Sequence, residues 1–324
     1  MNNKNSKLNR NNEDVVRQLI SNAEKAAKFS EIDTSAIHDE KFPKLLLHKN
    51  RIVRQKVVNG LIVDASETKN GIRARIVVKK RIELPIYLCF GVLEKKYDQR
   101  INIELVAEEN SEAKIYAFCT FPNAENVSHI MKAKYLLKKN SKIDYHEFHY
   151  HGKNGALVIP EIIVSCKENS SFNTSITSLY GVIGKIKYLV DVNLEKNSKC
   201  AALSKIKGSK DDKIIVVENA KLSGQNSSAV IKSRLISSEN SRAVFKGEIV
   251  GIGDESRGHV DCKEIIMDNG FAKTIPKLKV INKKARVTHE AAIGSVDKKE
   301  LQTLQARCLT REEAINLIVK GMLE

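Results

Sequence analysis

The sequence predicts a mainly β protein, a β-solenoid with short helical segments at its N- and C-terminal ends. An asparagine-containing turn returns about every 29 residues, which is typical of a stacked repeat. Apolar and polar residues alternate between the turns, which favours strands, and helical spacing occurs near the two ends of the chain. The alternative is a β-sandwich with many similar hairpin turns.

The stretch that ends at Arg81 precedes this repeat. Residues 1–13 are polar, and we expect them to be disordered. Within residues 1–30 this tail leads into an amphipathic helix over 14–29, whose apolar face comprises Val15, Val16, Leu19, Ile20, Ala23, Ala26 and Ala27. Residues 31–81 contain strand-like runs and are interpreted as a small N-terminal region without a readable function.

Residues 82–294 are predicted to form the β-helix core. Successive turns lie 30, 29, 28 and 29 residues apart, a half-step of 14 follows, and the last step is again 29; the turn residues are Asn110, Asn140, Asn169, Asn197, Asn226, Asn240 and Asn269. Asparagine tolerates the left-handed conformation that a sharp corner requires. Two strands and two corners per repeat make one coil of a solenoid. The usual Asn-Ser pair is not the Asn-Gly expected of tight hairpins, which argues against the sandwich.

Residues 295–324 are predicted to be helical. Ser295 or Asp297 can cap a first helix, and Thr310 with Glu313 forms a capping box for a second. The second helix is too short to be stable alone, so its apolar stripe needs a cover. Either the solenoid or a partner protein can provide this cover for Ala314, Ile315, Ile318, Val319 and Met322.

Composition excludes several classes of protein. The chain has no run of 18 apolar residues and no signal peptide, so we expect a cytoplasmic protein without a membrane span. Its six cysteines form no CxxC motif. The net charge of +16 is spread along the whole chain without a nucleic-acid-binding motif, so we do not expect nucleic acid as a partner. No phosphate-binding loop is present, so any ATP must be bound by another chain.

The most chemically suggestive stretch is 257–294. Cys262 can ligate iron as a thiolate, and the adjacent Lys263 is expected to lower its pKa. His289 and Glu290 follow about one coil later and can complete a coordination shell. A Cys–His–acid nucleophile is the rival chemistry. The histidines of YHEFHYHG also suggest a metal site, but a surface or corner role is the favoured interpretation for His146, His149 and His151.

Several motifs resemble the SufB/SufD family of iron–sulfur cluster assembly scaffolds. They are the Cys262 strand, the segment Ile275-Pro276-Lys277-Leu278, the signature THEAAIG at 288–294 and the helix pair containing 309–314. The resemblance covers about residues 82–322. It implies a right-handed parallel β-helix that dimerises through its last strands and docks a SufC-type ABC ATPase through its C-terminal helices. It also maps the family's cluster-building cysteine onto Cys262, its essential histidine onto His289 and its acidic ligand candidate onto Glu290.

The resulting hypothesis is a homodimeric, non-enzymatic scaffold in which an ATPase subunit supplies the ATPase activity. A transient 4Fe–4S cluster would be bound by Cys262, Glu290 and His289 as metal ligands and passed to recipient apoproteins. A sulfur route through Cys89, Cys119, Cys166 or Cys200 stays open. The alternatives are an interaction partner of the ATPase that binds no cluster and a basic β-solenoid that binds nucleic acid.

Overall fold

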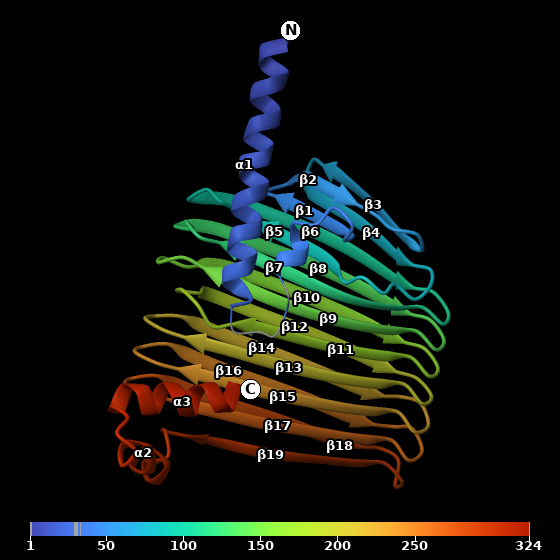
Figure 1. Cartoon of the computed structure of the whole chain (residues 1–324). Helices are drawn as coiled ribbons and strands as arrows, with labels where there is room; N and C mark the ends of the chain where they lie inside the picture. The colour runs from blue at the N-terminus through green and yellow to red at the C-terminus, as the bar shows by residue number, and fades with distance from the viewer. Residues whose placement is uncertain (1, 29–31, 33, 324) are drawn as a thin grey trace.

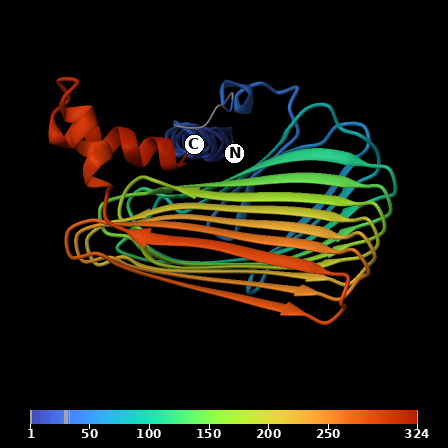
Figure 2. The same cartoon turned by 90° about the horizontal axis from the view of Figure 1, so that it is seen from below.

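The computed structural model describes residues 2–28, 32 and 34–323, with side chains from residue 12 onward. Its strands form two sheets that face each other (Figures 1 and 2). The first sheet contains, in spatial order, β2 (Arg51–Lys56), β1 (Lys44–His48), β5 (Ile86–Gly91), β7 (Glu112–Phe121), β9 (Lys142–His151), β11 (Ser171–Ser178), β13 (Lys199–Gly208), β15 (Ser228–Ser237), β17 (Arg257–Ile266) and β19 (Arg286–Gly294). The second contains β3 (Leu61–Thr68), β4 (Gly71–Val78), β6 (Lys96–Ala107), β8 (Asn126–Leu137), β10 (Ala156–Cys166), β12 (Gly184–Leu194), β14 (Lys213–Leu222), β16 (Arg242–Gly251) and β18 (Phe271–Val280).

The chain alternates between the two sheets, and each pair of strands adds one coil. The result is the predicted β-solenoid, with about eight turns. Parallel pairing places Lys199 beside Ser228 and Ser228 beside Arg257, so neighbouring coils are offset by one step of the asparagine repeat. The repeat in the sequence is therefore the length of one coil.

Asparagines form a ladder at the corners that lead from the second sheet into the first. Asn110, Asn140, Asn169, Asn197 and Asn226 all have φ between 55° and 60°. From Asn140 onward, each side-chain amide donates to the side-chain carbonyl of the preceding coil's asparagine at 2.9–3.2 Å. Asparagine therefore supplies both the left-handed backbone and a hydrogen bond between coils.

Asn240 and Asn269 belong to the opposite corners, which explains the half-step between Asn226 and Asn240. The expectation of a left-handed asparagine is wrong there, because the preceding residues, Glu239 and Asp268, take the positive φ of 55°. These corners have the left-handed residue one position earlier in the turn. The residue after the asparagine still closes the turn, through the bonds from Ser241 N to Ser238 O and from Gly270 N to Met267 O. Asn-Ser thus marks both corners, but it does not fix which residue is strained.

The strands of the N-terminal region extend the solenoid. β4 pairs with β6 in parallel and β1 pairs with β5 in parallel. β2 and β3 then add one antiparallel strand to each sheet. The stack therefore begins before residue 82, because the short alternating strands of 44–78 bury their apolar side chains in the same interior.

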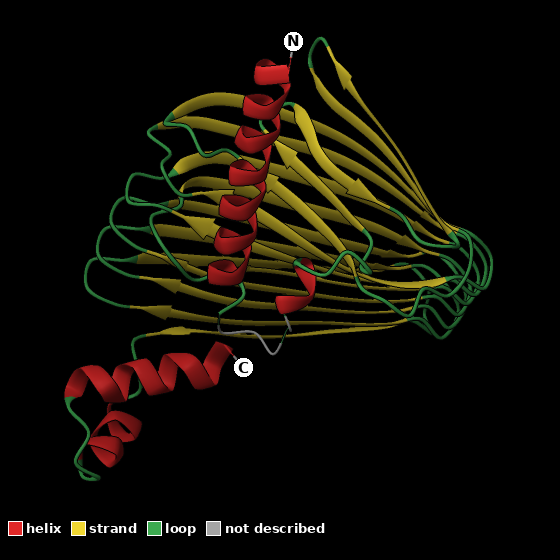
Figure 3. Ribbon diagram, turned by 45° about the horizontal axis from the view of Figure 1, so that its top comes forward, coloured by secondary structure: helices red, strands yellow, loops and turns green. Residues whose placement is uncertain are grey.

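A long helix covers the outer face of the first sheet near the start of the stack (Figure 3). This helix, α1 (Asn2–Ala26), begins at Asn2, within the tail that we expected to be disordered. Its predicted apolar face packs against the sheet and against the short 3-10 helix η1 (Ser35–Ile37). The predicted helix end at Phe29 lies outside the described residues. The buried side chains under α1 include Leu46, Tyr87, Cys89, Phe118 and Phe148.

Two short helices, α2 (Lys298–Gln305) and α3 (Arg311–Leu323), follow the last strand on the same side as α1 (Figures 1 and 2). Asp297 caps α2 by accepting a hydrogen bond from Glu300 N at 2.8 Å. The predicted capping box of α3 is confirmed, because Thr310 Oγ1 donates to Glu313 and accepts from Glu313 N. Ile315, Ile318 and Met322 of α3 are half-buried, and Leu317 is exposed. None of the described helices is long and apolar enough to cross a membrane.

Candidate functional site

The candidate site lies at the C-terminal end of the stack, where β18 and β19 each have a neighbour on one side only. In the last coil, side chains that would point into the interior lose their cover, because no further coil follows. His289, on the inner face of β19, is exposed for this reason, and Thr288 and Glu290 are exposed on its outer face. Five large apolar side chains are also exposed on β18, on β19 or just after β18: Phe271, Ile275, Val280, Ile281 and Ile293. An uncovered strand edge with an apolar surface is typical of an interaction site.

Cys262 points into the solenoid from β17. Even-numbered residues of this strand, from Gly258 to Glu264, are buried, whereas odd-numbered residues lie on the outer face. Burial raises the pKa of Cys262 to about 11, with further increases from the Glu264 and Asp261 carboxylates. The expectation that Lys263 lowers this pKa is therefore wrong, because the lysine is on the opposite face. At neutral pH the thiol therefore keeps its proton.

Cys262 belongs to the buried apolar cluster between the sheets, and polar groups lie beside it. Its neighbour on β15 is Ser233, whose hydroxyl donates to Glu264 at 3.0 Å. Glu264 is 3% exposed, and burial raises its pKa to about 7. A thiol and a carboxyl group thus share the inner face of β17, two residues apart, as the alternation predicted. A cation bound beside these two groups would favour the loss of their protons.

The outer face of β17 carries a different arrangement. Arg234 binds the Asp261 carboxylate through both guanidinium NH groups, at 2.5 and 3.1 Å. Partial burial raises the pKa of Asp261, but the Arg234 charge and hydrogen bonds outweigh it and leave the pKa below its usual value. His259 contacts Thr288 through its Nδ1, at 2.8 Å from the hydroxyl. These pairs connect β17 to β15 and to β19 on the outer face of the sheet. They do not contact the Cys262 side chain, which points inward.

The structure brings together two of the three predicted ligands. Register pairs Val260 with His289, Asp261 with Glu290, and Cys262 with Ala291. His289 therefore shares the inner face with Cys262, on the neighbouring strand and two positions earlier. Glu290 lies on the outer face beside Asp261. Within one chain, Glu290 and Cys262 point to opposite sides of the sheet.

A second group of potential ligands lies deep inside the stack, near its start. Sγ of Cys119 and side-chain donors of Glu147 and His149 all lie within 4.8 Å of one another. The predicted surface or corner role of His149 and His151 is wrong, because both are buried between the sheets. The strict alternation of β9 could have shown this, since Ile143 and Tyr145 have the same parity as these histidines.

The last coil and the matching families point to one class of protein. The profile for the SUF system FeS cluster assembly SufBD core domain matches residues 96–322. The chain is 35% identical over 311 residues to an iron–sulfur cluster assembly SufBD family protein of Methanocaldococcus jannaschii, covering 95% of this chain and 98% of that one. A relative in Pyrococcus horikoshii, named in the same way, is 32% identical over 294 residues, or 90% of each chain. The SufB protein of Bacillus subtilis is 34% identical over 70 residues, 21% of this chain and 15% of SufB.

The molecule is thus an iron–sulfur cluster assembly protein built on a β-solenoid. It belongs to the SufBD family.

Proposed function

We propose that the chain is a scaffold on which a nascent 4Fe–4S cluster is assembled between the last coils of two identical copies. The cluster is the cargo, bound transiently and then passed to recipient apoproteins. Cys262 supplies a thiolate and His289 an imidazole, with Glu290 as the carboxylate ligand. The observation that carries the proposal is the uncovered last coil, which exposes His289 and Glu290 one strand from the buried Cys262.

The open end supports a two-fold arrangement. The free edges of β18 and β19 offer unpaired backbone groups, and Phe271 and Ile275 are exposed beside them. Two copies that meet through these strands cover both edges at once. Alternation separates Glu290 from Cys262 within one copy, so the second copy is the natural source of a carboxylate on the thiol's side. Of the three proposed ligands, one chain alone places only Cys262 and His289 on the inner face, so the carboxylate ligand would come from the second chain.

The burial of Cys262 supports a gated site. A thiol with a pKa of about 11 between two sheets is protected from solvent until the last strands separate. We infer that a SufC-type ABC ATPase drives this opening from α2 and α3. A groove between these helices and the end of the sheet supports that position; its lining includes Ile265, Ile293, Leu304, Ile318 and Met322. Movement of the helices would act directly on β19, which they follow in the chain.

Anaerobic reconstitution with ferrous iron and sulfide tests the cluster site. The wild-type protein is expected to develop the broad visible absorption of an iron–sulfur cluster and to transfer it to a 4Fe–4S apoprotein. Cys262→Ala is expected to lose at least tenfold of the bound cluster, because a thiolate is the preferred ligand.

Two cysteine variants serve as controls. Cys308→Ala removes the exposed thiol, which can bind iron adventitiously, and Cys166→Ala removes a buried thiol far from the last coil. Both should reconstitute like the wild type. Equal reconstitution of Cys262→Ala would show that Cys262 is not a ligand of the cluster. A wild-type protein that binds no cluster would instead leave the chain as an interaction partner of the ATPase.

A further inference from the structure

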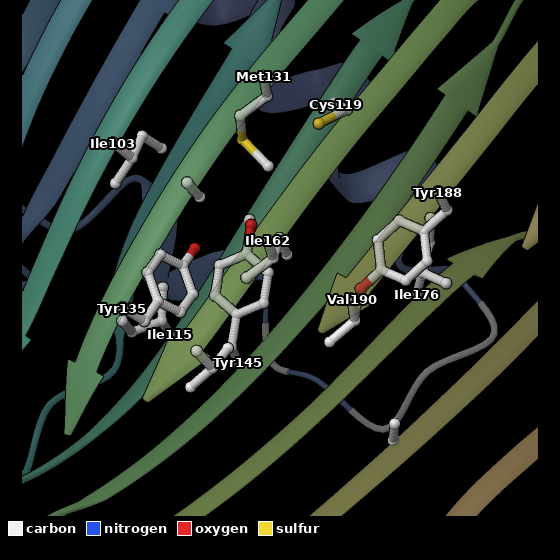
Figure 4. Packing of buried hydrophobic residues seen from close by; sticks show 14 of the residues in the cluster. Ile103, Ile115, Cys119, Met131, Tyr135, Tyr145, Ile162, Ile176, Tyr188 and Val190 are labelled. Atoms are coloured by element: carbon white, nitrogen blue, oxygen red, sulfur yellow. The ribbon is translucent and has the colours of Figure 1, made fainter. Parts of the chain in front are cut away.

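A second set of metal-ligand side chains lies several coils away from Cys262, between the two sheets. Cys119 comes from β7, His129 from β8 on the opposite sheet, and Glu147 and His149 from β9. All four residues are 0% exposed. Figure 4 shows Cys119 among the side chains that fill the space between the sheets. Donor atoms of Cys119, Glu147 and His149 lie within 4.8 Å of one another, and His129 reaches Cys119 from the opposite sheet.

The two distances from Cys119 are close to those between neighbouring donors of a tetrahedral metal site. Cys119 Sγ lies 3.6 Å from Glu147 Oε1 and 3.8 Å from His129 Nε2. Zinc bonds of about 2.0–2.3 Å place neighbouring tetrahedral donors roughly 3.3–3.7 Å apart. Glu147 Oε1 and His149 Nε2 are now hydrogen-bonded at 2.6 Å. They need to separate by less than about 1 Å, a change that side-chain rotation supplies.

Further hydrogen bonds aim the donors. The amide nitrogen of Gln99 donates to Lys49 O at 2.6 Å, which fixes the orientation of the amide and makes its Oε1 the acceptor for His129 Nδ1 at 2.7 Å. His129 therefore carries its proton on Nδ1 and directs the Nε2 lone pair toward Cys119. Tyr145 donates to the other Glu147 oxygen at 3.1 Å. Histidine and carboxylate ligands of metal sites are oriented by contacts of this kind.

Charge also favours a dication. Burial lowers the pKa of His129 to about 3 and that of His151 well below its usual value, so both rings are neutral. Burial raises the pKa of Glu147, but the hydrogen bonds from His149 and Tyr145 lower it, and the net shift of this pKa is downward. One carboxylate and one thiolate balance the two charges of a metal ion without a further counter-ion.

An unsatisfied histidine lies beside the cluster. His151 stacks on His149 with ring centroids 5.7 Å apart and is 1% exposed. Within the described part of the chain, neither of its ring nitrogens has a hydrogen-bond partner, and Nδ1 of His149 has none either. Buried polar groups normally find partners, so this region is incomplete without a further bound species.

We propose that Cys119, His129, Glu147 and His149 bind one resident divalent transition-metal ion, Zn²⁺ or Fe²⁺, that links the two sheets. Binding breaks the Glu147–His149 hydrogen bond, moves the His149 proton from Nε2 to Nδ1 and releases the Cys119 proton to solvent. The ion enters while the coils close during folding, because the finished site is sealed. This ion is separate from the cluster cargo, and its site does not depend on the last coil.

The test measures metal content in a Cys262→Ala background, in which the proposed cluster site contributes no iron. Protein produced with both metals available is expected to retain roughly one ion per chain after exhaustive chelation. Elemental analysis distinguishes zinc from iron. X-ray absorption should show one sulfur and three nitrogen or oxygen ligands without any further variant. Absence of a retained ion, or a first shell without sulfur, overturns the proposal.

Two variants locate the site. Cys119→Ser should lower the retained metal at least tenfold, whereas Cys166→Ala, at another buried thiol, should retain it. Tyr145→Phe removes only the hydroxyl that holds Glu147 and should weaken the affinity about 10–100-fold after refolding with Co²⁺. Tyr188→Phe is its matched control, because Tyr188 is a second fully buried tyrosine whose hydroxyl makes no hydrogen bond to Glu147.

The cobalt protein adds a readout that is independent of stability. A charge-transfer band from a Cys119 thiolate to Co²⁺ is expected in the parent and in Tyr188→Phe, and its persistence in Cys119→Ser would refute the assignment. Loss of cluster reconstitution at Cys262 with normal metal retention leaves this proposal standing. The reverse result leaves the scaffold proposal standing.

Discussion

Glu218 gives the interior of the solenoid a calculable dependence on pH. The side chain is 1% exposed on β14, and Ser204 donates to one of its oxygens at 2.6 Å. Burial raises its pKa from 4.5 to about 7. The folded protein therefore binds the proton more tightly than the unfolded chain. The contribution to stability is fully present below about pH 4.5 and is lost as pH rises through about 7.

The magnitude follows from the size of the shift. A displacement from 4.5 to about 7 corresponds to about 3 kcal/mol at 1.36 kcal/mol per pKa unit. Glu218→Gln keeps the shape and still accepts from Ser204, but it cannot ionise. The variant should match the wild type at pH 4.5 and be more stable by about 3 kcal/mol at pH 8. With an unfolding entropy of about 2.1 cal/mol/K per residue, this chain should gain about 5 °C in Tm.

Differential scanning calorimetry at several pH values checks this prediction. Glu161→Gln is the matched control, because Glu161 lies half-buried on the outer face of β10. Its Tm should follow that of the wild type at every pH. A Glu218→Gln difference that is the same at pH 4.5 and pH 8 would refute the argument, since only ionisation can produce the slope.

Three further predictions concern the corners, the thiols and the C-terminal helices. Asn169 has φ of 60° and makes two hydrogen bonds in the asparagine ladder. Asn169→Ala should lose about 2 kcal/mol of stability, whereas Asn169→Gly should lose only the contribution of the hydrogen bonds, because glycine accepts the left-handed conformation. Equal losses in thermal unfolding would show that the left-handed conformation does not matter. Iodoacetamide at pH 7 should modify Cys308 in the native chain and the five buried cysteines only after unfolding, as followed by mass spectrometry; rapid native labelling of Cys262 would disprove its protection. Leu317 is an exposed apolar side chain of α3, and Leu317→Asp should prevent co-purification of the ATPase without changing the circular dichroism spectrum. Asn316→Asp, at the adjacent residue, should retain the ATPase. If Leu317→Asp still binds the ATPase, the docking site lies elsewhere.

Much of the architecture could be predicted because a solenoid is nearly one-dimensional. The spacing of Asn140, Asn169 and Asn197 gave the coil length, and alternation gave the inner and outer faces. The same arithmetic was sufficient to separate two proposed ligands. One coil further along the chain, the residue beside Cys262 is Ala291, so Glu290 falls on the opposite face. The repeat length alone therefore predicts that Glu290 and Cys262 lie on opposite faces of the sheet. His289 and Glu290 are adjacent in the chain, but adjacent residues of a strand point to opposite faces.

The buried metal-ligand cluster could not be predicted in the same way. Cys119 and Glu147 share a sheet, so repeat length relates them. His129 belongs to the facing sheet, and its approach to Cys119 depends on how the two sheets are offset across the interior. Periodicity along the chain carries no information about that offset. The aromatic rings of Phe90 and Phe121 pack beside His129 there, with centroids 6.4 and 5.2 Å from the imidazole.

The two ends of the stack are unlike, and this limits how large an assembly can grow. β2 and β3 terminate the beginning with antiparallel strands that carry Arg51, Arg54 and Lys56 on one and Asp64 and Glu67 on the other. Such charges discourage the addition of another strand, whereas the opposite terminus presents phenylalanine and isoleucine. Under the proposed pairing, two copies joined through their last coils would cover this apolar edge. Association would then stop at a pair, and a coil geometry that could propagate into fibres would remain a closed particle.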